Sequence, residues 1–152
     1  MPIDIRTAET RDAAEISRVV IAALRATNAK DYPQAVIEQV EQSFSPGAVA
    51  ALIGKRTVFV AQAGERVVGT ASLDGQVVRT VFVQPDLHGK GIGRMLMETV
   101  EQTARDLGIE VLRVPSSVSA EHFYQKLGFC AVREQFHGEE RTIVMERRLP
   151  AL

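Results

Sequence analysis

The sequence is poor in features that mark several common classes of protein. Its 152 residues include one cysteine and no tryptophan. A single cysteine excludes a disulfide framework, and this favours a cytoplasmic setting. The formal net charge is −1, so no global basic field draws the chain to nucleic acid or to an anionic membrane. The low number of aromatic residues, two tyrosines and six phenylalanines, also disfavours a nucleic-acid partner.

Long apolar runs are missing as well. No stretch reaches the roughly 20 apolar residues that span a bilayer. The first residues, MPIDIRTAETRD, carry charge from the fourth position and lack the apolar core of a signal peptide. The remaining composition, 45% hydrophobic and 24% charged, is typical of a globular chain. We therefore expect one domain over residues 1–152, and no membrane partner.

A strand, a short loop and a helix are predicted between residues 77 and 107. The run VVRTVFV at 77–83 is apolar and largely β-branched, which predicts a strand buried on both faces. Pro85 ends this strand because it cannot donate to a ladder. Gly108 is the expected stop of the helix. The apolar residues of that helix recur on one face: Ile92, Leu96, Val100, Ala104 and Leu107.

The loop between this strand and helix is suited to an anion. Gly89, Gly91 and Gly93 alternate through it, and glycine allows a close approach to the backbone. The first N–H groups of a helix have no internal partner, and the helix dipole adds positive charge there. Lys90 and Arg94 add further positive charge. We expect a diphosphate, with Gly91 and Gly93 where a side chain would collide with it or with the helix start.

Two familiar phosphate loops do not fit this stretch. The P-loop needs Ser or Thr directly after Gly-Lys, and here Gly91 follows Lys90. The dinucleotide fingerprint needs a third glycine where Arg94 stands.

Two segments resemble the GNAT superfamily of N-acetyltransferases. The stretch VFVQPDLHGKGIGRMLM resembles the family's coenzyme A loop: Gly91 and Gly93 match, and His88 stands where the family has Gln or Arg. The stretch SAEHFYQKLGF resembles the N-x-x-x-F-Y-x-K-x-G-F box, with Ser119 at the usual Asn position.

The resemblance implies acetyl transfer from acetyl-CoA to a primary amine of a small molecule or peptide, with no metal. It makes Tyr124 the general acid on the departing thiolate, and it pairs the pantetheine with the backbone of the preceding strand, where Val83 N–H could donate to the oxyanion. An alternative is a non-catalytic acyl-CoA-binding or regulatory module. A homodimer is compatible with either. The expected cofactor contacts are Val81, Phe82, Val83, His88, Gly89, Lys90, Gly91, Ile92, Gly93, Arg94, Ser119, Phe123 and Lys126.

Neither the general base nor the acceptor can be named. The candidates for the base are Asp74, Glu110, His122 and the acids of the first helices, and no spacing singles one out. Residues 27–51 are expected to cover the acceptor side. Their charges are mixed and favour neither a polyamine nor an anionic acceptor: Lys30, Asp31, Glu38 and Glu41.

The expected element order predicts a mixed α+β fold, a mostly antiparallel sheet of about seven strands with helices on both faces. The resemblance implies the same fold. Strands are expected at 3–8, 57–63, 66–73, 77–83, 110–114, 129–136 and 141–149, and helices at 13–28, 34–44, 92–107 and 116–127. Residues 48–53 are left open between helix and coil.

Local signals refine these boundaries. Thr10 or Asp12 is the expected cap of the first helix, and Pro33 the first residue of the second. Pro115 is expected to end the fifth strand. Ser117 or Ser119 is expected to cap the following helix. Cys130 lies in an expected strand and is interpreted as a small core residue.

Overall fold

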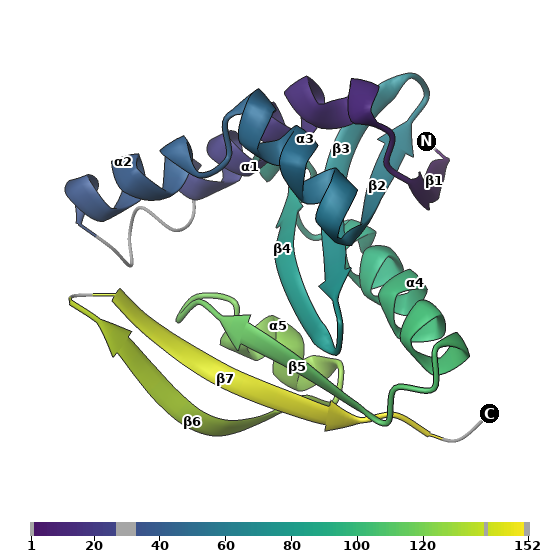
Figure 1. Cartoon of the computed structure of the whole chain (residues 1–152), viewed down its shortest axis with the longest axis vertical. Helices are drawn as coiled ribbons and strands as arrows, with labels where there is room; N and C mark the ends of the chain where they lie inside the picture. Colours follow the sequence, from purple (N-terminus) through teal and green to yellow (C-terminus); the bar gives the residue numbers. More distant parts are fainter. Residues whose placement is uncertain (1, 27–32, 139, 151–152) are drawn as a thin grey trace.

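The computed structural model describes residues 2–26, 33–138 and 140–150 (Figure 1). One sheet of seven strands runs in the order β1-β2-β3-β4-β5-β7-β6. Every neighbouring pair is antiparallel except β4 and β5. Helices α1 and α3 pack on one face, and α4 and α5 pack on the other. The predicted α+β fold is confirmed.

The elements follow one another in the expected order. The first half contains β1 (Ile3–Thr7), a 3-10 turn (Thr10–Asp12), α1 (Ala13–Ala26), α2 (Gln34–Gln42), α3 (Pro46–Lys55), β2 (Thr57–Ala63) and β3 (Arg66–Asp74). The second half contains β4 (Val77–Val83), a 3-10 turn (Pro85–Leu87), α4 (Ile92–Asp106), β5 (Val111–Ser116), α5 (Glu121–Lys126), β6 (Cys130–His137) and β7 (Glu140–Arg148).

The region before β2 is helical where the sequence left helix and coil open. Residues 48–53 are helical, because the Ser45 side chain accepts from Ala48 N and Pro46 occupies the first turn. Pro33 precedes α2 as its cap instead of starting it, since its own φ and ψ are extended. The expected end of α1 at 27–28, the turn at 31–32 and the charges Lys30 and Asp31 lie outside the described residues.

Several expected boundaries in the second half are wrong. Helix α4 ends at Asp106, so Leu107 caps it and is 66% exposed. Helix α5 starts only at Glu121 with Ala120 as its cap, because residues 117–120 form a separate turn in which Ala120 N donates to Ser117 O. Ser117 and Ser119 therefore do not cap it.

The expectation that Cys130 lies in the core is also wrong. It is exposed, because β6 is the edge strand of the sheet and all of its residues are exposed. The two buried cores lie elsewhere. One packs α4 and α5 on the sheet and contains Leu96 and Met97, and the other packs α1 and α3 and contains Val19 and Val20.

Strands β4 and β5 are paired at one register position only, Val77 with Arg113. Arg113 N donates to Gln76 O on the β4 side. Two residues further, the backbone nitrogen of Pro115 faces the same side and carries no hydrogen. Pro115 was expected to end β5, but the strand continues to Ser116 because Pro115 still pairs with Val144 of β7. The two parallel strands therefore part, as Figure 1 shows.

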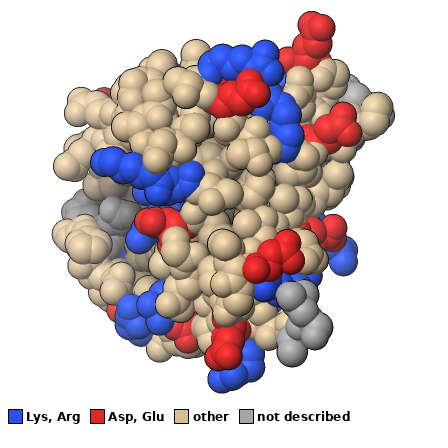
Figure 2. Space-filling model, turned by 45° about the vertical axis from the view of Figure 1, so that its right-hand side comes forward, with Lys and Arg blue, Asp and Glu red and all other residues tan. Residues whose placement is uncertain are grey.

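The surface shows no dominant sign of charge on the face that Figure 2 presents. Lys and Arg side chains lie among Asp and Glu side chains there, with uncharged residues between them. None of the helices in the described ranges has both the length and the apolar character that a bilayer crossing requires.

Asp12 anchors the start of the chain instead of capping α1. Its carboxylate accepts from Glu9 N at 2.7 Å and from both terminal nitrogens of Arg6 at 2.9 Å. The residue is 4% exposed. The hydrogen bonds from Arg6 hold the pKa of Asp12 below its ordinary value, against the opposing effect of burial.

We expect Asp12→Asn to lower the free energy of unfolding by about 1–3 kcal/mol at neutral pH, because a nearly buried charge-assisted contact is lost. Since the pKa of Asp12 is depressed on folding, its contribution is present at neutral pH and is lost as pH falls through the folded-state pKa. The variant should therefore show a shallower acid loss in urea titrations. Glu9→Gln is the control: its exposed pair with Arg11 is worth about 0–1 kcal/mol. Equal effects of the two variants would contradict the role of Asp12.

Candidate active site

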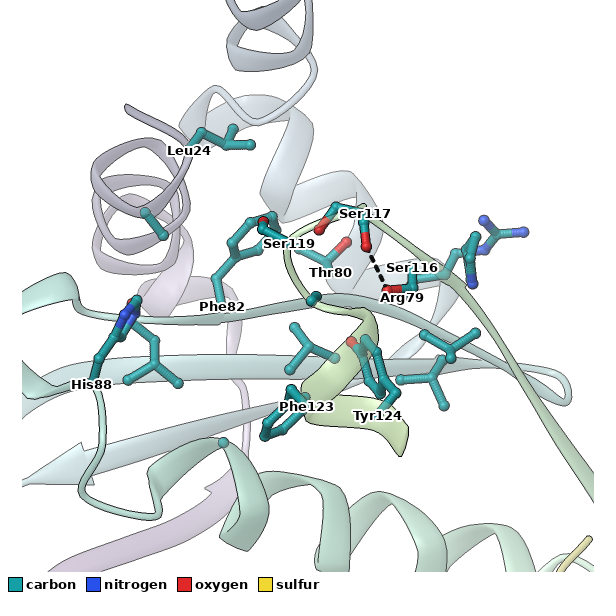
Figure 3. Close-up of a pocket in the computed structure, with 18 of the residues that line it drawn as sticks. Leu24, Arg79, Thr80, Phe82, His88, Ser116, Ser117, Ser119, Phe123 and Tyr124 are labelled. Carbon is teal, nitrogen blue, oxygen red and sulfur yellow. Dashed lines mark hydrogen bonds between the residues drawn. The ribbon is translucent and has the colours of Figure 1, made fainter. Parts of the chain in front are cut away.

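A cavity of about 800 Å³ opens where β4 and β5 part (Figure 3). Its walls come from β4, β5, the 88–94 loop, the start of α4, the 116–124 segment and, on the opposite face, α1 and α2. Twelve expected site residues line it: Val81, Phe82, Val83, His88, Gly89, Gly91, Ile92, Gly93, Arg94, Ser119, Phe123 and Tyr124. Lys90 and Lys126 are exposed and do not line it.

The glycines of the loop serve two purposes. Gly89 and Gly91 have φ of 80° and 81°, a conformation that side chains disfavour, and a Cβ at either would meet no protein atom within 4 Å. The expected collision of a Gly91 side chain with the helix start is therefore absent. A Cβ at Gly93 would lie 3.1 Å from Phe123 Cζ. Gly93 thus lets α4 pack against Phe123, and Gly89 and Gly91 leave the backbone open to the cavity.

The charged residues of the loop have different partners. His88 Nε2 lies 3.0 Å from Val83 O, so its ring turns back to the end of β4. Arg94 lies on the first turn of α4, where its Nε is 3.5 Å from Glu98 Oε1 in an exposed pair. Both line the cavity at the end where helix N–H groups are unpaired.

The backbone of β4 presents hydrogen-bonding groups to the cavity. Gln84 N donates to Val68 O on the β3 side. Since successive N–H groups of a strand point to opposite sides, Phe82 points its N–H toward β3, and Val81 and Val83 point theirs away from it, toward the gap. These two residues are the strand donors that can meet a ligand.

A β-bulge interrupts β4 beside this stretch. Thr70 pairs with Phe82 and Ser72 with Arg79, so β4 carries one extra residue. Val78 and Val81 both pack toward the α4 core, which leaves Arg79 and Thr80 between them.

Thr80 takes the strain of the bulge. Its φ is 55°, rare for a β-branched residue, and its Oγ1 accepts from Arg56 Nη1 at 3.3 Å. The expectation that β4 is buried on both faces is wrong: only Val78 is fully buried, because the rest of the strand forms the cavity wall.

Arg56, Arg79 and Thr80 line the cavity but are not among the predicted site residues. One signal in the sequence could have identified the last two. Two consecutive polar residues interrupt the apolar run VVRTVFV, which is what a bulge in a buried strand requires. Nothing local to Arg56 indicates its role, since its side chain meets Asp74 of β3 and Thr80 of β4, 18 and 24 positions away.

Tyr124 lies on α5 with its hydroxyl toward the cavity (Figure 3). Its ring makes edge-to-face contacts with Phe123 and Phe129, at centroid distances of 5.1 and 5.7 Å. The residue is 5% exposed, and burial raises the pKa of its phenol. The phenol therefore holds its proton over the whole neutral range.

Candidates for a base do not reach this cavity. Asp74, Glu110 and His122 do not line it, and no described lining residue is Asp or Glu. No three His, Cys, Asp or Glu residues gather as a metal site within the described ranges.

We expect Thr80→Asn to raise the free energy of unfolding by about 1 kcal/mol, because Asn tolerates positive φ better than a β-branched residue. Its amide oxygen can still accept from Arg56. Thr57→Asn, in a regular part of β2, is the control and should lower stability by up to about 1 kcal/mol. Chemical denaturation of both variants measures the difference. A loss of similar size in both would show that Thr80 stores no strain.

The sequence matches the family model described as an acetyltransferase (GNAT) domain over residues 28–146. A search of curated protein sequences gives no match.

Solved structures of similar fold cover nearly the whole chain. A GCN5-related N-acetyltransferase from Rhodopseudomonas palustris is 25% identical with a TM-score of 0.90, over 98% of this chain and 97% of that one. The PaiA N-acetyltransferase from Thermoplasma acidophilum, in complex with coenzyme A, is 21% identical with a TM-score of 0.85, over 97% and 99%. YncA, a putative acetyltransferase from Salmonella typhimurium with acetyl-CoA, is 23% identical with a TM-score of 0.67, over 97% and 94%.

Proposed function

Because the chain belongs to the GNAT acetyltransferase family, we propose that it transfers an acetyl group from acetyl-CoA to a primary amine of a small molecule or peptide. The observation that carries this proposal is one cavity lined by the glycine loop, β4 and Tyr124. The solved relatives from Thermoplasma acidophilum and Salmonella typhimurium hold coenzyme A and acetyl-CoA, respectively.

The anion loop is the proposed site of the diphosphate. Its open glycines allow close approach, the first N–H groups of α4 supply donors, and Arg94 adds positive charge. His88 already contacts Val83 O through Nε2, so only its other ring nitrogen remains for a phosphate oxygen. The N–H groups of Val81 and Val83 are the proposed donors to the pantetheine and to the thioester oxygen.

Tyr124 is the proposed general acid. The neutral acceptor amine attacks the acetyl carbon, the carbon–sulfur bond breaks, and the sulfur takes the phenolic proton. The nitrogen of the new amide then gives up its extra proton, which returns the Tyr124 phenolate to the phenol. A phenol is protonated at neutral pH with or without burial, so the proton is present when the sulfur departs; burial raises the pKa of Tyr124 and makes the phenol a weaker acid. With no described carboxylate lining the cavity, the acceptor ammonium is proposed to lose its proton to water.

We expect Tyr124→Phe to retain fold and acetyl-CoA affinity and to lower kcat by about 100-fold, the lower end for general acids, because a thiolate is a good leaving group. The measurement is thiol release with a panel of amines, alongside calorimetric binding of acetyl-CoA. Tyr124→Leu also removes the ring, and should in addition lose stability. If Tyr124→Phe keeps its kcat while chemistry limits turnover, the general-acid role is wrong.

We expect Gly91→Val to abolish acetyl-CoA binding while the protein stays folded, because the side chain would enter the space in front of the loop amides. Gly64→Val is a matched control. Gly64 also has positive φ, 61°, and an open surrounding, but it lies in the β2–β3 turn. Both variants place a valine at a positive φ, and only Gly91→Val should lose binding in calorimetry. Equal affinity in the two variants would place the diphosphate elsewhere.

The amine panel also separates the enzyme from a non-catalytic acyl-CoA-binding module. Acetyl-CoA binding together with thiol release that depends on an added amine supports the enzyme. Binding without thiol release for every amine supports the module.

A further inference from the structure

The charged side chains that line the cavity are all positive. Among the described residues that line it, the charged side chains are Arg56, Arg79 and Arg94, and none is Asp or Glu. Arg94 belongs to the anion loop that follows the end of β4. Arg56 and Arg79 lie near the start of β4, and Figure 3 shows His88 and Arg79 at opposite ends of the cavity. One basic end suits the diphosphate, and the other is far enough from it to meet a different anion.

The second basic end is built and partly buried. Arg79 Nε is 3.2 Å from Asp74 Oδ2, and Arg56 Nε is 4.0 Å from the same oxygen. Two guanidinium groups thus share one carboxylate, which leaves one positive charge in excess. The Arg56 side chain is 19% exposed, and burial together with the charge of Arg79 lowers the pKa of its guanidinium. An anion at this place would oppose both effects, because an opposite charge stabilises the guanidinium cation.

Arg56 is also held in position with donors to spare. A guanidinium carries five N–H donors. In the part of the chain that the structure describes, Arg56 uses one of them in a hydrogen bond, from Nη1 to Thr80 Oγ1. The bulge at Thr80 therefore orients the fork, and the remaining donors match the two oxygens of a carboxylate.

The wall beside this basic end is apolar. Phe44 and Phe82 pack edge to face with their centroids 6.4 Å apart, and both line the cavity. Figure 3 shows Leu24 and Phe82 on the same side of it. The cavity lining also includes apolar residues of α2: Val36, Ile37 and Val40.

We propose that the acceptor amine carries a carboxylate held by Arg56 and an apolar body that lies against Phe44 and Phe82, as a free amino acid with an apolar side chain does. This inference rests on the proposed acetyl transfer. A polyamine would bring a second positive charge to a site that already has an excess of positive charge.

The test compares matched acceptors in the thiol-release assay. Phenylalanine and phenethylamine share an amine and a ring, and only the first has a carboxylate. We expect kcat/KM at least about 10-fold higher for phenylalanine, since hydrogen bonds to a charged group are strong. Spermidine is included as the polyamine. Equal or better use of phenethylamine or spermidine would overturn the proposal and leave the acetyl transfer intact.

Arg56→Gln is the decisive variant. It should raise KM for phenylalanine about 10- to 100-fold and leave both phenethylamine turnover and acetyl-CoA affinity unchanged. Lys55→Gln removes a neighbouring exposed charge that does not line the cavity, and it should change nothing. Arg56→Lys keeps the positive charge but lacks the paired N–H donors of the guanidinium. This variant replaces Arg56→Gln in the test if Arg56→Gln fails to fold. Equal KM values for phenylalanine in the wild type and the Arg56 variants would overturn the proposal.

A binding measurement separates this inference from the acetyl transfer itself. Phenylalanine is titrated calorimetrically into protein saturated with coenzyme A. Binding that is lost in Arg56→Gln supports the carboxylate site even if turnover is absent. No binding of phenylalanine to the wild type overturns it, whereas failure to bind acetyl-CoA and to release thiol overturns the proposed function.

Discussion

The separation of β4 from β5 is the constraint on which the rest of the site depends. The strands share a single parallel pair, Val77 with Arg113. Beyond it, the nitrogen of Pro115 faces β4 without a hydrogen, so a continued ladder would lack a donor. Buried backbone groups need partners, and the cleft-facing N–H groups of Val81 and Val83 remain for a ligand. The gap in the sheet thus forms the cavity and also leaves backbone N–H groups free to bind a ligand there.

The bulge in β4 is a second departure from regular pairing, and it affects the sheet face opposite α4. Strand β4 has one extra residue between Arg79 and Phe82, which pair with Ser72 and Thr70 of β3. This bulge turns Arg79 and Thr80 out of the α4 core. Thr80 accepts an unfavourable φ, and its hydroxyl holds Arg56. Local strain is therefore stored where two arginines approach one carboxylate. This arrangement gives the Arg79 end of the cavity its charge, while α1, α2 and Phe44 give the cavity an apolar wall.

Much of the fold could be predicted because strand and helix periodicities are local. The strand β2 was predicted to the residue. Errors fell where the outcome depends on neighbours in space. Leu107 continues the apolar stripe of α4 but lies past its last turn. Cys130 was expected in the core because a strand was expected there, yet β6 is an edge. Pro115 reads as a strand end, and only the pairing with β7 reveals that its strand continues.

The sequence by itself determined the loop of glycines, the box around Tyr124, the family and the α+β fold, because each is written in residues that are close along the chain. Only the tertiary structure decided which residues far apart in the sequence come into contact. Gly93 is required by Phe123 thirty positions on, His88 contacts the end of β4, and Arg56 is held by Thr80. The positive cavity follows from these contacts, although the whole chain has a net charge of −1. The physical reason is that such pairings depend on sheet register and packing, which a local pattern does not specify.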